Sequence, residues 1–210
     1  MCSTDVFNMT EIISADDETA FQKTKDAISI GKIVIYPTDT VYGIGCNALN
    51  AESVEQIKKI KGRDGNKAMS VILGTLSLIR EYCEVSEKQA AILATYLPGP
   101  FTFILRLKKG KEKILGYIAG ADGGIGIRVP EHQMMRRIST GLGIPIITTS
   151  ANPSGEKDAI EFGKINRNIV SACDLAIDGG KTKYAAPSTV VDLTDGNGAM
   201  KVLRKGAGRI

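Results

Sequence analysis

Ile144-Pro-Ile-Ile-Thr-Thr-Ser-Ala-Asn-Pro-Ser-Gly155 is the stretch around which the other sequence features are arranged. It begins with a short apolar, β-branched run, which predicts a buried strand. The small polar side chains of Thr148, Thr149, Ser150 and Asn152 follow without any charge. In open α/β sheets, ligands bind where the carboxyl ends of the strands leave the sheet. A plain Asx or Ser turn accounts for the same residues equally well, so this stretch alone leaves both interpretations open.

The composition is that of one ordinary globular domain. The chain has 210 residues, of which 43% are hydrophobic and 24% charged, and its formal net charge is +4. No run is apolar enough to span a membrane, and residues 1–14 show no secretory pattern, so we expect a cytoplasmic protein. Four scattered cysteines without C-x-x-C spacing, together with a single histidine, argue against a zinc site.

Hydrophobic periodicity predicts helices at 16–31, 51–60 and 86–97, and another helix that starts at Glu131. Besides the opening stretch, short apolar runs predict strands at 33–36, 69–73, 102–107, 124–130, 173–177, 187–193 and 200–206. The last two are joined by Asp195-Gly-Asn-Gly198, a turn that favours an antiparallel hairpin. The sequence shows no internal repeat and no clear domain boundary.

Polar residues are concentrated in residues 37–45, Pro-Thr-Asp-Thr-Val-Tyr-Gly-Ile-Gly, directly after the strand at 33–36. The segment reads as a loop with three hydroxyl groups, one carboxylate and two glycines. Glycine lets a backbone approach a ligand closely or adopt a positive φ. A functional loop is favoured over a purely geometric connection, because polar residues are so dense immediately after a strand.

Three basic residues stand out by their surroundings. Lys61 and Arg63 leave the helix at 51–60 two residues apart, and in an extended segment both would point into one cavity and suit a polyphosphate. The alternative is a cationic last turn that stabilises the helix dipole. Arg128 lies on an apolar strand, where its charge is costly unless it pairs with a carboxylate or faces a ligand. His132, four residues on, either reaches the same cavity or is a simple cap-region residue.

Together the polar outliers favour phosphoryl chemistry over acid–base hydrolysis. The sequence has no readable carboxylate pair, Ser/His/Asp arrangement or G-x-S-x-G motif. The phosphate loop G-x-x-x-x-G-K-[ST] is absent as well. Four cations with hydroxyls and an amide can bind a triphosphate and neutralise charge as a phosphorus–oxygen bond changes hands. The set comprises Thr38, Lys61, Arg63, Arg128, Ser150, Asn152, Ser188 and Arg204.

Six short motifs occur in order and together carry a family resemblance. They are Thr-Asp-Thr-Val-Tyr-Gly at 38–43, Lys-x-Arg at 61–63, Pro-Gly-Pro-x-Thr at 98–102, Arg-x-Pro-x-His at 128–132, Ser-x-Asn at 150–152 and Ser-Thr-Val-Val-Asp at 188–192. The chain resembles the YrdC-type threonylcarbamoyl-adenylate synthase family in its single-domain form. The resemblance covers about residues 15–206 of one domain spanning 1–210. Each motif is weak alone, but their order is specific.

The resemblance implies an α/β fold, with a twisted open mixed sheet flanked by helices and a large basic concave surface. It also implies the reaction of L-threonine, bicarbonate or CO2, and ATP to threonylcarbamoyl-AMP and pyrophosphate, with Mg2+ entering with ATP. The product serves the N6-threonylcarbamoyl modification of adenosine 37 in tRNA, through downstream transfer proteins. Binding of double-stranded RNA or tRNA is implied too.

Residue roles carried over from the family are expectations at this point. The resemblance implies that Lys61 and Arg63 are catalytic and bind ATP together with Arg128, Ser150, Asn152 and Arg204. It implies threonine binding by Thr38, Ser70, His132, Ser150 and Ser188, and no protein ligand for the metal. Longer relatives close the site with an additional C-terminal domain. Because this chain ends at Ile210, we expect closure to come from elsewhere or to be absent.

Two other functions stay open from the sequence. One is a paralogous carbamoyl-transfer enzyme of the same fold, such as the domain of hydrogenase-maturation carbamoyltransferases. The presence of both Lys-x-Arg and Ser-x-Asn argues against it. The other is a non-catalytic RNA-binding protein that uses Lys and Arg to neutralise phosphates. With only 5% aromatic residues, stacking platforms are few, so such a protein would bind duplex RNA or tRNA.

Overall fold

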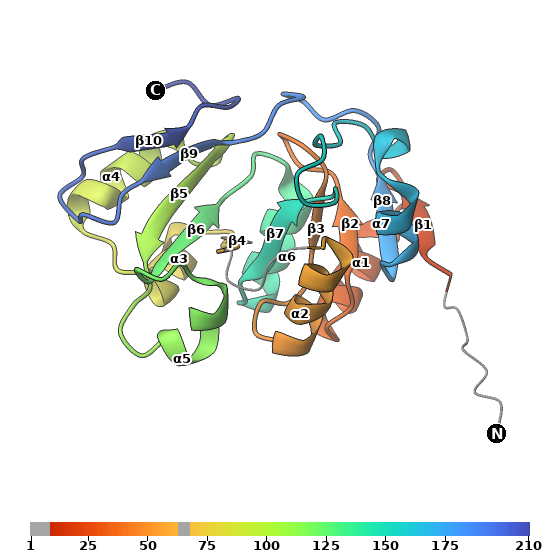
Figure 1. Cartoon of the computed structure of the whole chain (residues 1–210), viewed down its shortest axis with the longest axis horizontal. Helices are drawn as coiled ribbons and strands as arrows, with labels where there is room; N and C mark the ends of the chain where they lie inside the picture. Colours follow the sequence, from red (N-terminus) through yellow and green to blue (C-terminus); the bar gives the residue numbers. More distant parts are fainter. Residues whose placement is uncertain (1–8, 63–67) are drawn as a thin grey trace.

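The computed structural model describes residues 9–62 and 68–210, and within them the fold is built on one mixed sheet of ten strands. The spatial order is β1-β8-β2-β3-β7-β4-β6-β5-β9-β10 (Figure 1). Parallel and antiparallel neighbours alternate irregularly along it. The strands are β1 (Glu11–Ser14), β2 (Val34–Tyr36), β3 (Gly43–Gly45), β4 (Ser70–Ile72), β5 (Phe101–Arg106), β6 (Gly124–Arg128), β7 (Ile146–Ser150), β8 (Leu175–Asp178), β9 (Thr189–Asp192) and β10 (Lys201–Arg204).

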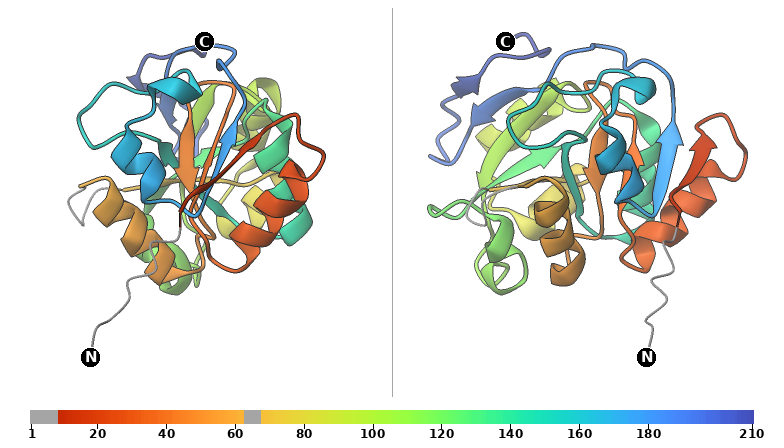
Figure 2. Two further views of the ribbon diagram at one scale, coloured as in Figure 1. Left: turned by 90° about the vertical axis from the view of Figure 1, so that its right-hand side faces the viewer. Right: turned by 45° about the vertical axis from the view of Figure 1, so that its right-hand side comes forward.

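Helices cover both faces of this sheet. Helix α1 packs beside α6 on one face, and α2 and α7 lie on the other (Figure 2). None of the described helices is long and apolar enough to cross a membrane. Their bounds are α1 (Ala20–Ser29), α2 (Ala51–Ile60), α3 (Leu76–Tyr82), α4 (Glu87–Tyr96), α5 (Glu112–Leu115), α6 (Gln133–Leu142) and α7 (Arg167–Ser171), with 3-10 turns at Gly116–Ile118 and Phe162–Lys164.

The two faces of the sheet bury different kinds of side chain. On one face Phe103, Ile127, Val71 and Ile147 form a continuous row across β5, β6, β4 and β7, and all four belong to the larger hydrophobic core. The opposite face carries a second core only at one end, where α1 and α6 cover it. The remainder of that second face is therefore available for a binding site.

Most predicted elements are confirmed, with small shifts in their ends. The helix predicted at 51–60 has the same bounds, and Ser86 caps α4 through a capping box with Gln89. The last two strands form the predicted antiparallel hairpin. Cys46, Cys83 and Cys173 are buried thiols, and burial raises the pKa of each to about 12.

Some local features differ from the prediction or were not predicted. The loop predicted for 37–45 ends in strand β3, because Gly43–Gly45 pairs with both β2 and β7. A run of lysines at 108–113, after β5, leads into helix α5, and Lys111 pairs with Glu81 and lies over the ring of Tyr82. Strand β1 and helices α3 and α7 were not predicted at all.

Gly45 shows how tightly the centre of the sheet is packed. A Cβ atom on this residue would lie 1.9 Å from the backbone oxygen of Ile147 and 2.8 Å from the hydroxyl of Tyr36. That hydroxyl donates to the same Ile147 oxygen over 3.0 Å. Glycine is required here by close backbone approach rather than by backbone conformation.

We expect Gly45→Ala to lower the free energy of unfolding by at least about 2 kcal/mol, because the added methyl group must displace backbone. Gly141→Ala is the matched control, since its Cβ would meet nothing within 4 Å near the exposed end of α6. It should raise stability by roughly 0.5–1 kcal/mol through better helix propensity. Urea unfolding of both variants measures this, and equal effects would contradict the packing described.

Candidate functional site

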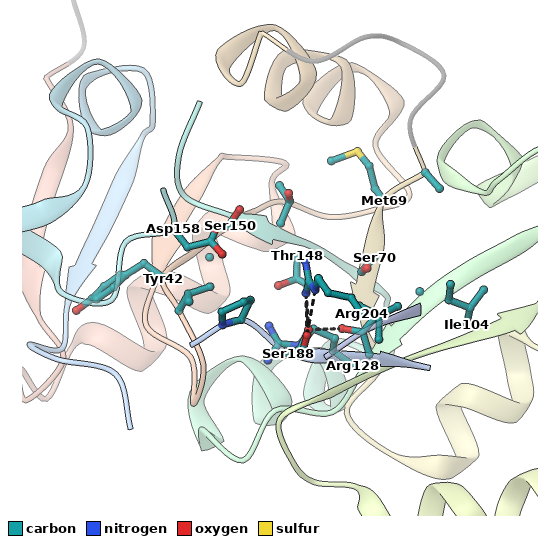
Figure 3. Close-up of a pocket in the computed structure, with 18 of the residues that line it drawn as sticks. Tyr42, Met69, Ser70, Ile104, Arg128, Thr148, Ser150, Asp158, Ser188 and Arg204 are labelled. Atoms are coloured by element: carbon teal, nitrogen blue, oxygen red, sulfur yellow. Dashed lines mark hydrogen bonds between the residues drawn. The ribbon is translucent and has the colours of Figure 1, made fainter. Parts of the chain in front are cut away.

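A cavity of about 280 Å³ opens over the second face of the sheet. Its floor follows from strand register: Ile104 lies opposite Gly126, Gly126 opposite Ser70, and Ser70 opposite Thr148. Because side chains alternate along a strand, this row points away from the larger core. Two hydroxyl groups and a glycine thus take the places that apolar side chains occupy on the other face (Figure 3).

Gly126 keeps this floor open. A Cβ at this position would lie 2.4 Å from the hydroxyl oxygen of Ser70 and 3.1 Å from the methyl group of Thr102. Any side chain here would therefore force its neighbours to move and would fill the cavity from below. Glycine is needed at position 126 to keep space open in the cavity, and not to form a turn.

Arg128 is the most buried cation that lines the cavity. The residue is only 7% exposed, and its Nη2 atom donates to Asp39 Oδ1 over 3.1 Å and to Thr40 Oγ1 over 2.8 Å. Its Nε atom is buried and has no hydrogen-bond partner among the residues that the structure describes. Burial lowers the pKa of Arg128, and the adjacent Asp39 carboxylate opposes this effect. The sequence predicted that Arg128 either pairs with a carboxylate or faces a ligand. In the structure Arg128 pairs with Asp39 and also lines the cavity.

The hydroxyl groups beside Arg128 are ordered in one direction. The Thr38 hydroxyl donates its only proton to the Val41 carbonyl over 2.6 Å. The Thr40 hydroxyl, 3.0 Å away, therefore donates to Thr38 and accepts from Arg128. Each hydroxyl proton in this series of hydrogen bonds has a fixed acceptor. The loop at 38–41 is therefore a rigid support for the guanidinium group.

Ser188 and Arg204 meet at another wall of the cavity. The guanidinium group of Arg204 donates through Nη2 to the Ser188 backbone oxygen over 2.9 Å and contacts the Ser188 hydroxyl at 3.3 Å (Figure 3). That hydroxyl lies 2.8 Å from the Thr102 hydroxyl. Strand β10 thereby places an exposed cation at the cavity, while β5 and the residue just before β9 place buried hydroxyls there.

Lys61 is buried at the end of α2 and contacts the stretch at residues 144–155. Its Nζ atom donates to the backbone oxygens of Ser150 and Asn152, the latter over 2.7 Å, and lies 3.4 Å from Asn152 Oδ1. The exposed fraction of Lys61 is 4%. The predicted pairing of Lys-x-Arg with Ser-x-Asn is thus present for Lys61, whereas Arg63 lies outside the described residues.

A second recess lies behind the Asp39–Arg128 pair and contains Thr38 and His132. The structure does not bring these two residues to the cavity over the sheet, although both were predicted to surround threonine. His132 is the N-cap residue of α6, and its buried Nδ1 atom has no hydrogen-bond partner in the described ranges 9–62 and 68–210. Burial lowers the pKa of His132 below its usual 6.5, and the nearby Asp39 only partly opposes this.

The cavity over the sheet contains about half of the residues predicted for the site. Ser70, Arg128, Ser150, Ser188 and Arg204 line it, while Lys61 and Asn152 lie against its Ser150 wall. Four further polar lining residues were missed as site residues: Thr102, Thr148, Thr149 and Asp158. Asp39, which pairs with Arg128, was missed too. Thr102 and Thr148 could have been found from the strand alternation that places Ser70 on the same face.

The cavity lining fits a magnesium ion that enters with a nucleotide. Mg2+ keeps water and phosphate ligands and needs one or two carboxylates at most. Asp158 is the carboxylate among the lining residues, and it has no hydrogen-bond or ion-pair partner in the described parts of the chain. Asp158 would therefore be the residue that holds such an ion, with the hydroxyl groups around it.

These features define a mixed α/β protein with a cationic, hydroxyl-lined cavity suited to anionic substrates. Residues 26–206 match the sequence model of the Sua5, YciO and YrdC proteins, which is described as telomere recombination. The chain therefore belongs to the Sua5/YciO/YrdC family. A Methanocaldococcus jannaschii protein named as a threonylcarbamoyl-AMP synthase is 35% identical over 190 residues, which are 90% of this chain and 88% of the relative.

Solved structures support the same family. Sua5 of P. abyssi, solved in complex with L-threonine, has a TM-score of 0.83 and 26% identity, and the match covers 94% of this chain. This chain spans 57% of the length of that protein. YciO of E. coli has a TM-score of 0.80 at 24% identity, with 96% of both chains covered, and shows the fold alone.

His132 should make stability depend on pH. Its pKa in the folded protein is below its unfolded value of 6.5, so the unfolded chain binds more protons at mildly acidic pH. The contribution is therefore fully present above that value and is lost as the pH falls below it. Between about pH 7.5 and 5.5 we expect the free energy of unfolding to fall by roughly 0.5–1 kcal/mol more in the wild type than in His132→Gln. Urea unfolding of both proteins across this pH range measures the difference. The same pH dependence of the free energy of unfolding in both would contradict the assignment.

Proposed function

We propose that this protein is a threonylcarbamoyl-AMP synthase, a nucleotidyltransferase. It joins L-threonine, bicarbonate or CO2, and ATP into threonylcarbamoyl-AMP and releases pyrophosphate. The observation that carries the proposal is the buried Arg128, which opens toward a cavity lined by Ser70, Thr102, Thr148 and Ser188. The relative at 35% identity bears this enzyme name, and the Sua5 structure was solved with L-threonine.

Threonine occupies the Arg128 end of the cavity. Arg128 is already half-neutralised by Asp39 at 3.1 Å, so it suits a singly charged carboxylate better than a polyphosphate. The surrounding hydroxyl groups can both donate to and accept from a small amino acid with its own hydroxyl. This assigns Arg128 to threonine rather than to ATP, with Ser70 and Ser188 in the threonine-binding roles expected from the sequence.

ATP occupies the end with the remaining cations. Arg204 lines one wall of the cavity, and Lys61 lies against the Ser150 wall, where its Nζ atom donates to backbone oxygens. With Arg63 they would balance the charge of the triphosphate and of the departing pyrophosphate. Ser150 and Asn152 form the wall that Lys61 fixes, where they border the nucleotide.

The reaction then needs positioning more than acid–base catalysis. The threonine amine takes up CO2 to form a carbamate, and one carbamate oxygen attacks the α-phosphorus as pyrophosphate leaves. Mg2+ would supply charge neutralisation when it binds together with ATP, and Asp158 would be the residue that holds it. Arg128 holds the carboxylate of threonine so that the carbamate faces the phosphorus. Lys61 and Arg63 stabilise the negative charge on the leaving pyrophosphate.

The product is an activated intermediate for tRNA threonylcarbamoylation, so downstream transfer proteins must take it up in the cytoplasm. The test of this function is direct. The purified protein is incubated with labelled threonine, bicarbonate, ATP and Mg2+, and pyrophosphate and threonylcarbamoyl-AMP are measured. Failure to form product, with binding of double-stranded RNA or tRNA retained, would favour an RNA-binding protein instead.

We expect Lys61→Ala to reduce product formation at least about 100-fold, because one buried cation near the departing pyrophosphate is lost. Lys59→Ala is the matched control, since Lys59 is an exposed lysine of the same helical turn and should keep full activity. Circular dichroism would check that both variants fold. Full activity of Lys61→Ala would refute the phosphate role assigned to this residue.

A further inference from the structure

We propose that Asp39 is a positioning residue that fixes Arg128 for threonine binding, an inference that rests on the proposed function. The carboxylate does not line the cavity over the sheet and lies behind the guanidinium group, where it lines the second recess. Asp39 therefore acts on the substrate only through Arg128.

The geometry gives Asp39 two separate tasks. Oδ1 accepts from Arg128 Nη2 over 3.1 Å, and Oδ2 accepts from the backbone N–H of Glu131 over 3.1 Å. The backbone oxygen of Asp39 accepts from the N–H of Tyr184 over 2.8 Å. The carboxylate is thus held between the end of β6 and the start of α6, and its side chain is only 1% exposed.

The contacts on Nη2 fix how Arg128 presents itself to a ligand. Asp39 and Thr40 both accept hydrogen bonds from Nη2, and neither of them lines the cavity that Arg128 lines, so these bonds hold the guanidinium group from behind. Thr40 is itself fixed, because its hydroxyl donates to Thr38 and its backbone oxygen accepts from Thr182 over 2.8 Å. A guanidinium group with four single-bond rotations would otherwise lose entropy on binding.

The negative charge of Asp39 stabilises the buried Arg128, in addition to the hydrogen bonds. A buried cation without a partner is costly, so Arg128 would turn toward water if its carboxylate were removed. Asn can replace the hydrogen bonds of Asp39 but not its charge. The Asp39→Asn variant therefore separates the shape of this residue from its electrostatic role.

The test compares Asp39→Asn with the wild type by steady-state kinetics and by calorimetric titration with L-threonine. We expect the KM and Kd for threonine to rise roughly tenfold or more, while the KM for ATP changes by less than about twofold. A general loss of structure would raise both KM values together and lower the melting temperature. Glu131→Gln is the control, because this exposed acid of the same recess pairs with Lys183 and should leave both KM values unchanged.

A double-mutant comparison tests that Asp39 acts through Arg128. Arg128→Lys alone should weaken threonine binding, and adding Asp39→Asn to it should cost little more. Fully additive effects, or an unchanged threonine KM in Asp39→Asn, would overturn the proposal. If Asp39→Asn fails to fold, Thr40→Val removes the other acceptor without a charge change and should raise the threonine KM about threefold. An unchanged threonine KM in Thr40→Val would overturn it as well. Wild-type protein that neither binds threonine nor forms product would refute the proposed function itself.

Discussion

The strict alternation of side chains along a β-strand is the constraint on which this structure depends. Across β5, β6, β4 and β7 it produces two parallel rows, one on each face of the sheet. Phe103, Ile127, Val71 and Ile147 make one row and hold the sheet on its core. The adjacent residues Ile104, Gly126, Ser70 and Thr148 make the other row and form the floor of the cavity. The residues that stabilise the fold and those that form the site are therefore sequence neighbours, and a register slip of one residue would exchange them.

Local signals made much of the fold predictable, because they are read within a few residues. The helix at 51–60 was predicted with correct bounds from its periodicity. The start of the helix at 86–97 was predicted at Ser86, which is the N-cap residue of α4. Strand β3 was missed because Gly43–Gly45 has low intrinsic strand propensity and is held by its neighbours β2 and β7. Tertiary pairing overrode the local preference at that point.

The site was predictable in its cations but not in its partners. The sequence shows that a charge on the apolar strand of Arg128 needs compensation, yet it does not show that Asp39, 89 residues earlier, provides it. For His132, spacing left open either a place in the cavity of Arg128 or a cap-region residue, and the structure makes it the N-cap residue of α6, in the recess behind the pair. Such contacts depend on how distant segments pack, which a short motif does not encode.

The distribution of charge in the cavity argues for an order of binding sites along the sheet. Where Asp39 compensates Arg128, the local charge is close to neutral and the neighbours are hydroxyl groups. Arg204 contacts Ser188 and is exposed, so it adds a positive charge beside the Arg128–Asp39 pair that solvent screens in part. A singly charged amino acid suits the paired Arg128, whereas the highly charged nucleotide suits the additional cation beside it. On the proposed function, the carbamate forms between them, next to the phosphorus that it attacks.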